Sequence, residues 1–272
     1  MGSIIDYYTA FDEWGRLDRE PLEFQINWHY IQKYLPSSGH ILDNGAGPGK
    51  YAMRLAQAGH TVTLTDLVPR LVEVAKEKAA ELSVAEQFAD FHVADARDLS
   101  HFSDEVFDAS LALGPMYHLQ EKEDRNKAIK ELYRVTKKDG FVFVAFMPRV
   151  RHVLNSLRSP LRWKPNHEAE NLEKFSETGI FNHADEGRFT GAYYFNVEDI
   201  APFMEQHGFE TVQLIGSSNL GGLMTEEEMS YWQERGEPQQ MMNIFIEAAK
   251  DPTLLGVSTH LLYIGRRIGS SS

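Results

Sequence analysis

A glycine-rich loop follows the first predicted strand of the chain. It runs from Asp43 through Gly45, Gly47 and Gly49, with one residue between each pair, Ala46 among them. Glycine lets the backbone approach a ligand closely, and the N-terminus of the helix that follows offers unpaired N–H groups to polar or anionic ligand atoms. The spacing therefore predicts a ligand-binding loop.

Acidic residues follow the next two predicted strands. Asp66-Leu67 ends the second strand, and Asp95-Ala96 ends the third. Ligands of open α/β sheets bind at the carboxyl ends of the strands, so we expect these carboxylates to lie beside the glycine-rich loop. A carboxylate at Asp66 can accept both hydroxyl protons of a ribose, and one at Asp95 can accept from an exocyclic amine. The expected ligand is a nucleoside.

The elements that position these residues alternate along the chain. Short runs of β-branched residues alternate with segments of helical period, which indicates a parallel sheet flanked by helices. The predicted strands are 40–44, 61–65, 91–94, 107–113, 141–147, 211–215 and 260–265. The predicted helices are 21–34, 51–58, 69–82, 124–138, 197–207 and 226–250, and Asp139-Gly140 is expected to end the fourth of them.

The chain is predicted to be a single domain, 1–272, with an N-terminal cap segment at 1–36 and an inserted lid at 148–195, between strands five and six. The lid has no clean period, and Pro160 and Pro165 interrupt any long helix there.

The lid also reverses the charge of the chain. Its basic residues and histidines are Arg149, Arg151, His152, Arg158, Arg162, Lys164 and His167. This cluster indicates either a surface that attracts an anionic acceptor or a lipid surface, or an ordinary solvent-exposed face. The aromatic residues of the lid are Trp163, Phe181, Phe189, Tyr193 and Tyr194. We expect these to roof an apolar acceptor pocket, the alternative being a plain lid core.

Composition excludes several classes of function. Lys and Arg number 27 against 40 Asp and Glu, a net charge of -13 that repels a phosphate backbone and makes nucleic acid an unlikely partner. The absence of cysteine excludes disulfides, thiolate zinc sites, iron–sulfur clusters and cysteine nucleophiles, and no other metal-ligand set emerges. No stretch approaches the roughly 18 apolar residues of a membrane span, and no signal-peptide pattern is present, so we expect a cytoplasmic protein.

Two kinds of nucleoside cofactor fit such a sheet. The dinucleotide pattern G-x-G-x-x-G requires a third glycine where this chain has Lys50, which disfavours NAD. Instead, the Asp43–Gly49 loop, Asp66, Asp95-Ala96 and the Leu113-Gly114-Pro115 end of strand four resemble the class I S-adenosylmethionine-dependent methyltransferases. The resemblance covers residues 39–147.

That resemblance implies a Rossmann-like three-layer α/β/α sandwich whose seven-stranded, mostly parallel sheet has an antiparallel last strand. It places the glycine-rich loop under the methionine part of the cofactor, Asp66 at the ribose and Asp95 at the adenine. The implied reaction transfers a methyl group from S-adenosylmethionine to a small molecule and leaves S-adenosylhomocysteine.

Candidate catalytic residues follow strand four. His118, preceded by Tyr117, lies where the acceptor pocket of the family opens, and it is either the general base or a structural histidine. In the cap segment, Tyr8 and Arg16 are expected either to hold the methionine carboxylate or to belong to an aromatic staple. Methylation of an RNA or protein side group, and a non-catalytic sensor, are the alternative functions. The oligomeric state stays open.

Overall fold

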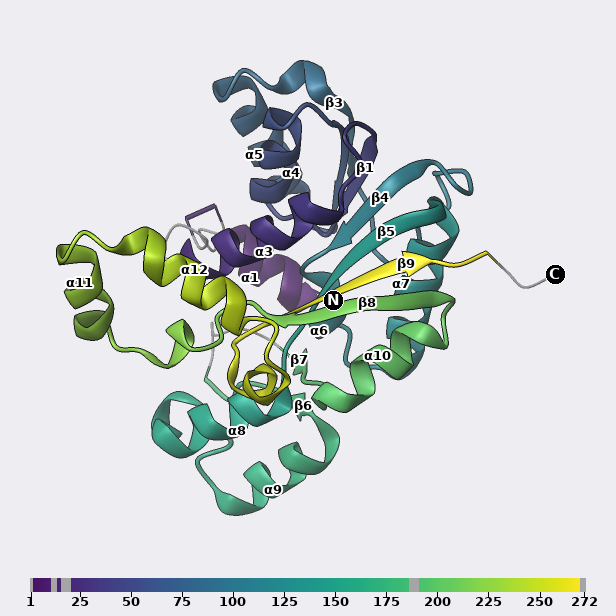
Figure 1. Cartoon of the computed structure of the whole chain (residues 1–272). Coiled ribbons are helices and arrows are strands. Elements are labelled where there is room, and N and C mark those ends of the chain that lie inside the picture. Colours follow the sequence, from purple (N-terminus) through teal and green to yellow (C-terminus); the bar gives the residue numbers. More distant parts are fainter. Residues whose placement is uncertain (1, 11–13, 16–20, 186–190, 270–272) are drawn as a thin grey trace.

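The computed structural model describes residues 2–10, 14–15, 21–185 and 191–269. Its centre is a seven-stranded sheet with the strand order β3-β2-β1-β4-β5-β9-β8 (Figure 1). The strands are β1 (His40–Asn44), β2 (Thr61–Asp66), β3 (Phe88–Val93), β4 (Phe107–Ala112), β5 (Thr136–Phe146), β8 (Phe209–Gly216) and β9 (Leu261–Arg267). Only β9 runs antiparallel to its neighbours, as the resemblance implies.

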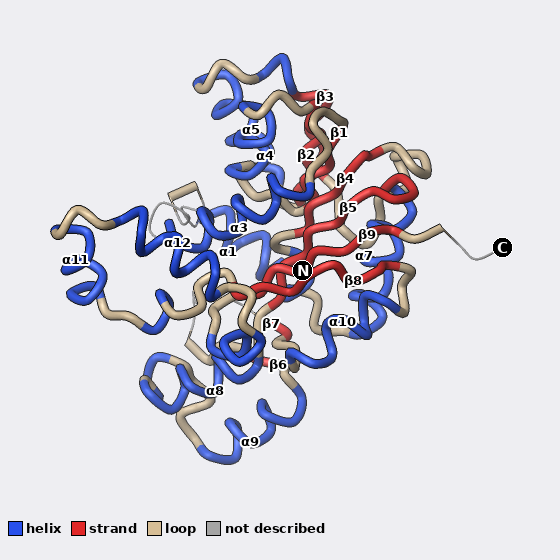
Figure 2. The backbone as a smooth tube through the Cα atoms, viewed as in Figure 1, coloured by secondary structure: helices blue, strands red, loops and turns tan. Residues whose placement is uncertain are grey.

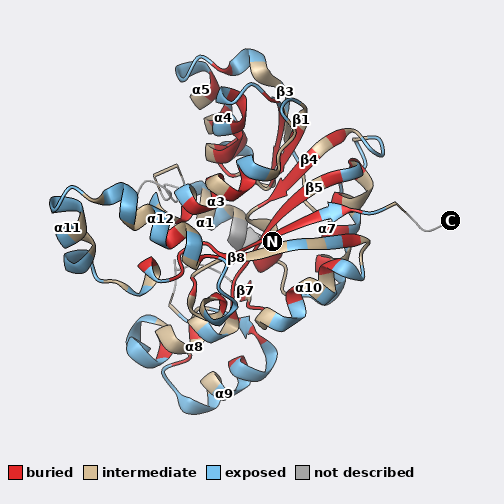
Figure 3. Ribbon diagram, in the orientation of Figure 1, coloured by how far each residue is buried: buried red, intermediate tan, exposed pale blue. Residues whose placement is uncertain are grey.

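Helices cover both faces of the sheet, which gives the expected three-layer sandwich (Figure 2). One face packs against α3 (Pro21–Tyr34), α4 (Lys50–Gln57), α5 (Pro69–Glu81) and α12 (Pro238–Ala248). The other face packs against α6 (Pro115–His118), α7 (Lys122–Val135) and α10 (Val197–Glu205). The sheet and its inner helix faces hold most of the buried apolar residues (Figure 3).

The remaining elements lie at the carboxyl end of the sheet or beside it. They are α1 (Gly2–Ala10), α8 (Arg149–Arg158), α9 (Ala169–Thr178), β6 (Ile180–Phe181), β7 (Ala192–Tyr193) and α11 (Glu226–Glu234), with short 3-10 turns at Ala85–Gln87, Pro160–Arg162, Gly221–Leu223 and Pro252–Val257. Helix α8 ends before Pro160, as expected for a proline that cannot continue a helix. Strands β6 and β7 form a separate two-stranded sheet.

Two predicted helices differ from those observed, and the strands predicted at 91–94 and 141–147 begin earlier, at Phe88 and Thr136. Helix α7 ends at Val135, before Asp139-Gly140, because Thr136 already pairs with Phe107 of β4 and the chain then bulges through Asp139, whose φ is 64°. The predicted helix 226–250 is two helices, because Gly236 takes a φ of 76° and a proline at position 238 begins the second.

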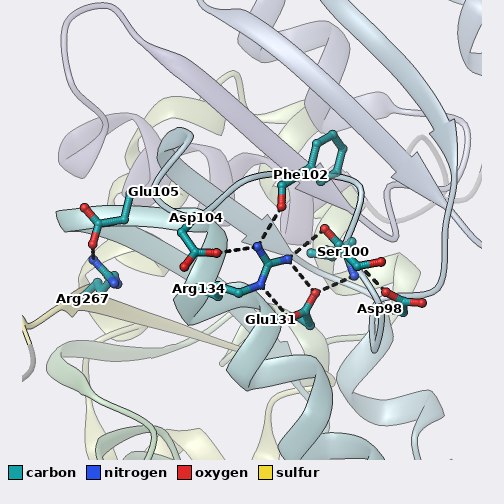
Figure 4. Close-up of polar contacts among 9 residues, drawn as sticks. Asp98, Ser100, Phe102, Asp104, Glu105, Glu131, Arg134 and Arg267 are labelled. Carbon is teal, nitrogen blue, oxygen red and sulfur yellow. Dashed lines mark hydrogen bonds and ion pairs between the residues drawn. The ribbon is translucent and has the colours of Figure 1, made fainter.

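The loop that follows β3 is fixed by Arg134 of α7 (Figure 4). The Arg134 guanidinium donates to the carbonyl oxygens of Leu99 and Phe102 and pairs with Asp104 and Glu131, at distances of 2.8 to 2.9 Å. Such a planar group with five donors suits several acceptors at once. The loop that begins with Asp95 is therefore anchored to the helical layer behind it.

Candidate active site

The glycine-rich loop lies at the point where the strand order reverses, between β1 and β4. Gly45 and Gly47 take left-handed φ values of 69° and 58°. A Cβ atom on Gly45 would clash with Cγ of Pro115, in the segment that follows β4. Both the backbone conformation and this close approach require glycine at position 45.

Asp66, at the end of β2, holds the loop in place. Its Oδ2 accepts a hydrogen bond from the backbone N–H of Gly47 at 2.7 Å, and its Oδ1 accepts one from Val68 at 2.8 Å. The side chain is nearly buried and lines a cavity. Each carboxylate oxygen can accept a second hydrogen bond, so Asp66 can support the loop and accept from a ligand hydroxyl at the same time.

Asp95 is paired with an arginine. Arg97 Nη2 lies 2.6 Å from Asp95 Oδ2 and its Nε lies 2.9 Å from Oδ1, while its Nη1 donates to Asp124 of α7 at 2.6 Å. Burial raises the pKa of Asp95, but the hydrogen bonds and positive charge of Arg97 outweigh burial and lower that pKa below its ordinary value. Asp95 is therefore an ionised hydrogen-bond acceptor beside the cavity.

The pKa of Asp43, at the base of the loop, is raised, unlike that of Asp95. Burial, followed by the negative charge of Asp66, raises the pKa of Asp43 to about 7, although a backbone hydrogen bond from Ala52 acts against this. The two carboxylates beneath the loop therefore differ in their surroundings, because Asp66 accepts two backbone hydrogen bonds whereas Asp43 is 2% exposed in an apolar layer.

Tyr8 and His118 also line the cavity. The Tyr8 hydroxyl, on α1, lies 3.0 Å from Nε2 of His118, and the two rings meet edge to face. Tyr117 packs against the His118 ring, and its hydroxyl donates to the carbonyl oxygen of Leu113 at 3.2 Å. Helix α1 is tied to α5 by a hydrogen bond from Arg70 Nε to the carbonyl oxygen of Thr9. The hydroxyl–imidazole pair therefore joins α1 to the segment after β4 at the cavity lining.

One cavity of about 500 Å³ joins these groups. The predicted site residues that line it are Tyr8, Asp43, Gly45, Ala46, Gly47, Asp66, Leu67, Asp95, Ala96, Leu113, Gly114, Tyr117 and His118. Gly49 was expected here and is not among the lining residues, since it caps α4 and a Cβ on it would meet Leu64 of the core at 2.7 Å. Arg16 lies outside the described residues.

Several residues that line the cavity were not predicted as site residues from the sequence. They are Pro48, Lys50, Tyr51, Val68, Leu71, Ala94, Arg97, Pro115, Leu119, Gln120, Glu121, Asp124, Asn182, His183 and Gly191. Gln120, in the loop between α6 and α7, is bonded to the lid, because its Nε2 donates to Asn182 Oδ1 at 3.0 Å and to the carbonyl oxygen of Phe181 at 3.2 Å. Arg97 could have been found from its place directly after the Asp95-Ala96 motif, but the lid residues carry no comparable signal.

The four lid aromatics that the structure describes do not line the cavity, contrary to expectation. Phe181 and Tyr194 pack around His152, and Trp163 lies at the edge of the same cluster. Tyr193 instead stacks under the guanidinium of Arg125 at 3.5 Å, and Phe189 lies outside the described residues. Trp163, Phe181 and Tyr194 belong to one buried cluster with Phe175, whereas Tyr193 packs against the cluster on the face of the sheet covered by α7 and α10.

Comparison with known proteins identifies the family. Residues 42–144 match the family described as a methyltransferase domain. This chain therefore contains a class I S-adenosylmethionine-dependent methyltransferase domain. The matched region of this domain includes the glycine-rich loop, Asp66, Asp95 and the end of β4.

Relatives of the domain support this identification over part of their length. The chain is 38% identical over 110 residues to a ubiquinone/menaquinone biosynthesis C-methyltransferase of Zymomonas mobilis, which is 39% of this chain and 42% of that protein. It is 32% identical over 151 residues to a glycine/sarcosine N-methyltransferase of Aphanothece halophytica, 51% of this chain and 53% of that one. The chain thus spans about half the length of these relatives.

Solved structures show the same fold over most of the chain. A methyltransferase of Methanosarcina mazei aligns with a TM-score of 0.60 at 19% identity, covering 88% of this chain and 97% of the other. The Burkholderia thailandensis 1,6-didemethyltoxoflavin-N1-methyltransferase, with that compound and S-adenosylhomocysteine bound, aligns with a TM-score of 0.56 at 15% identity, covering 97% and 84%. Alignments at such low sequence identity show that the chain shares the fold of these structures.

The residues present fit S-adenosylmethionine, the cofactor of this class. Five carboxylates line the cavity, namely Asp43, Asp66, Asp95, Glu121 and Asp124, against the two cations Lys50 and Arg97. An excess of acid suits a ligand with a sulfonium and an ammonium group. The close backbone at Gly45 and the acceptors on β2 and β3 match the flat nucleoside and its hydroxyls.

Among the described residues, no group of three or more histidine or acidic side chains is placed to hold a metal ion. Within the same part of the chain, no helix has the length and apolar character needed to cross a membrane.

Proposed function

We propose that this chain transfers a methyl group from S-adenosylmethionine to an oxygen, nitrogen or carbon atom of a small-molecule acceptor. The observation that carries the proposal is the single cavity that joins the strand-end carboxylates Asp66 and Asp95 to the Tyr8–His118 pair. The proposed cofactor-binding groups and the candidate proton acceptor thereby line one cavity.

The cavity favours a small acceptor. Its volume of about 500 Å³ must hold both cofactor and acceptor, and Tyr8 of α1 together with Asn182 and His183 of the lid line it. Its excess of acid disfavours a phosphate-bearing polymer. The Aphanothece and Burkholderia relatives are named for small acceptors, which agrees with this proposal.

When bound, the cofactor would supply a methyl group that is attached to a positively charged sulfur. The methyl group would pass to the acceptor by in-line displacement. The chain positions the reactants and excludes water. In our proposal Asp66 accepts from the ribose hydroxyls, Asp95 with Arg97 borders the adenine, and the backbone at Gly45 and Gly47 lies against the methionine part. Gln120 holds the lid strand β6 over the acceptor side.

We further propose that His118 takes the acceptor proton. With Nε2 unprotonated, the Tyr8 hydroxyl donates to it. As the acceptor atom forms its bond to the methyl carbon, its proton passes to the Tyr8 oxygen while the Tyr8 proton passes to Nε2 of His118. Tyr117 positions the His118 ring through direct packing.

Binding and turnover test this function separately. We expect titration calorimetry to show binding of S-adenosylmethionine and S-adenosylhomocysteine but not of NADH. A screen of small amines, phenols, carboxylic acids and quinols, read by release of S-adenosylhomocysteine, should then identify an acceptor class. Binding with turnover only on RNA or protein would replace the small-molecule proposal. Binding without any turnover would favour the sensor. Failure to bind the cofactor would reject the enzyme and the sensor alike.

Cofactor affinity should depend on pH through Asp43. Since its pKa in the folded protein is about 7, Asp43 is mostly neutral at pH 6 and ionised at pH 8. A cationic cofactor favours the ionised form, so binding releases a proton, and the affinity should rise with pH by up to about 10-fold per unit below pH 7. Calorimetry at pH 6, 7 and 8 on the wild type and Asp43→Asn checks this, since the cofactor's own groups titrate equally with both. Parallel pH profiles for the two proteins would contradict it.

A further inference from the structure

Arg125 of α7 is buried without an ion-pair partner among the described residues. Its side chain is 6% exposed, and none of the ion pairs between described residues includes it. Burial lowers the pKa of its guanidinium, although Tyr193 and two glutamates near the start of α7 act against this. Taking a charged group out of water is costly unless other contacts compensate for it. The groups that surround Arg125 therefore indicate its role.

Two hydrogen bonds from Arg125 hold the chain between α6 and α7. Its Nη1 donates to the carbonyl oxygens of Leu119 and Gln120, both at 2.7 Å. Helix α6 ends at His118, and Leu119 is extended, with a φ of -91° and a ψ of 93°. Carbonyl groups between two helices need donors from outside those helices. The Arg125 side chain supplies that donor.

The segment that Arg125 holds carries the proposed proton acceptor. Residues 117–121 all line the cavity, and His118 directly precedes Leu119. Arg125 does not line the cavity itself, so it can act on the reaction only through this segment. A misplacement of about 1 Å in a reacting group can cost about 100-fold in rate. The position of the His118 imidazole relative to Tyr8 therefore matters for turnover.

The lid holds the other side of the Arg125 guanidinium. Its Cζ lies 3.5 Å from the centroid of the Tyr193 ring on β7, a geometry in which a cation is attracted to the face of an aromatic ring. Gln120 also donates to the carbonyl oxygen of Ala192 in β7 at 3.4 Å. Strand β7 lies beside α6 (Figure 1). The lid and the 119–121 segment are thus joined through two side chains.

We propose that Arg125 is a positioning residue of the methyl transfer, which joins lid strand β7 to the 119–121 segment and thereby fixes the His118 imidazole beside Tyr8. This inference rests on the proposed function, because it assigns Arg125 to the reaction through His118. A lysine at this position could reach a carbonyl oxygen, but it has no planar group to stack on Tyr193.

Kinetics of the full chain, with the acceptor that the screen identifies, test the proposal. We expect Arg125→Met to lower kcat about 10- to 100-fold, while the affinity for S-adenosylmethionine stays within about threefold of the wild type. In the His118→Ala background the same substitution should cause no further loss of kcat, since Arg125 acts through His118. An arginine that serves only the stability of the fold would lower kcat by the same factor in both backgrounds.

A matched pair of variants tests the lid side of the contact. Tyr193→Phe keeps the ring face and should retain the wild-type kcat, whereas Tyr193→Leu removes it and should lower kcat about 3- to 10-fold. This pair decides the question alone if Arg125→Met unfolds. The control for loss of an arginine is Arg266→Met, because Arg266 pairs with Glu210 and does not line the cavity. It should leave kcat unchanged.

Amide hydrogen exchange of residues 115–121 gives a readout that does not need turnover. Exchange should rise in Arg125→Met and Tyr193→Leu and stay at the wild-type level in Tyr193→Phe. Unchanged exchange in the first two variants, a wild-type kcat in both, or a wild-type kcat in His118→Ala overturns the role of Arg125 and leaves the methyl transfer standing. Failure of the wild type to methylate any acceptor overturns the proposed function and this inference together.

Discussion

Asp66→Ala should lower the affinity for S-adenosylmethionine by about 100-fold or more. The side chain accepts two backbone hydrogen bonds, from Gly47 and Val68, and in our proposal also accepts from the ribose. Hydrogen bonds to a charged group contribute about 1.5–3 kcal/mol each, and 1.4 kcal/mol corresponds to a factor of ten in affinity. Loss of the ribose contact and loosening of the loop therefore combine. Titration calorimetry at fixed pH measures the effect.

Two further variants separate these contributions. Asp66→Asn keeps the size of the side chain and one acceptor oxygen, so it should support the loop better than alanine while it still weakens the ribose contact. Glu234→Gln removes an exposed carboxylate at the end of α11 that does not line the cavity, and it should leave the affinity unchanged. If Asp66→Ala binds the cofactor within threefold of the wild type and melts at the same temperature, Asp66 does not hold the ribose.

The strand ends of the site were predictable because they depend on local sequence. Asp43 and Asp66 lie at the ends of β1 and β2, and Asp95 comes two residues after β3. Parallel strands place their carboxyl ends at one edge of the sheet. The register of β1 with β2, in which Asn44 pairs with Thr65, brings the Gly45 loop beside Asp66. Asp43, Asp66 and Asp95 line the cavity for this reason.

Long-range pairing could not be predicted in the same way. Tyr8 and His118 are 110 residues apart, and no periodicity indicates that α1 folds back across the carboxyl ends of the strands. The bulge at Asp139 likewise depends on a tertiary contact, the pairing of Thr136 with Phe107. The lid is harder still, because its cluster around His152 contradicts the usual rule that buried residues are apolar.

The buried histidine shows why residue type alone misleads within this lid. Burial lowers the pKa of His152 to about 3, so it stays neutral and packs as an aromatic ring. His118 has the same residue type but lines the cavity beside a hydroxyl group. Position relative to the cavity, rather than composition, distinguishes a structural histidine from a candidate base.

His118→Ala should reduce kcat about 100- to 10,000-fold with the acceptor that the screen identifies, as expected for loss of a general base. Tyr8→Phe should reduce kcat by a similar factor, because the proposed path carries the proton through the Tyr8 oxygen to Nε2 of His118. Since the two groups act as one unit, the double variant should be little slower than either single variant. Steady-state kinetics from pH 6 to 9 measure all three.

The control for this prediction is cofactor binding. If His118 acts on the acceptor proton alone, the affinity of His118→Ala and His118→Gln for S-adenosylmethionine should stay within about threefold of the wild type while kcat falls, because a proton-transfer group contributes to the transition state rather than to ground-state binding. A parallel loss of affinity and kcat would assign His118 to cofactor binding. Turnover within a few-fold of wild type across this pH range would show that methyl transfer needs no base at this position, and that the Tyr8–His118 contact serves to hold α1 over the cavity.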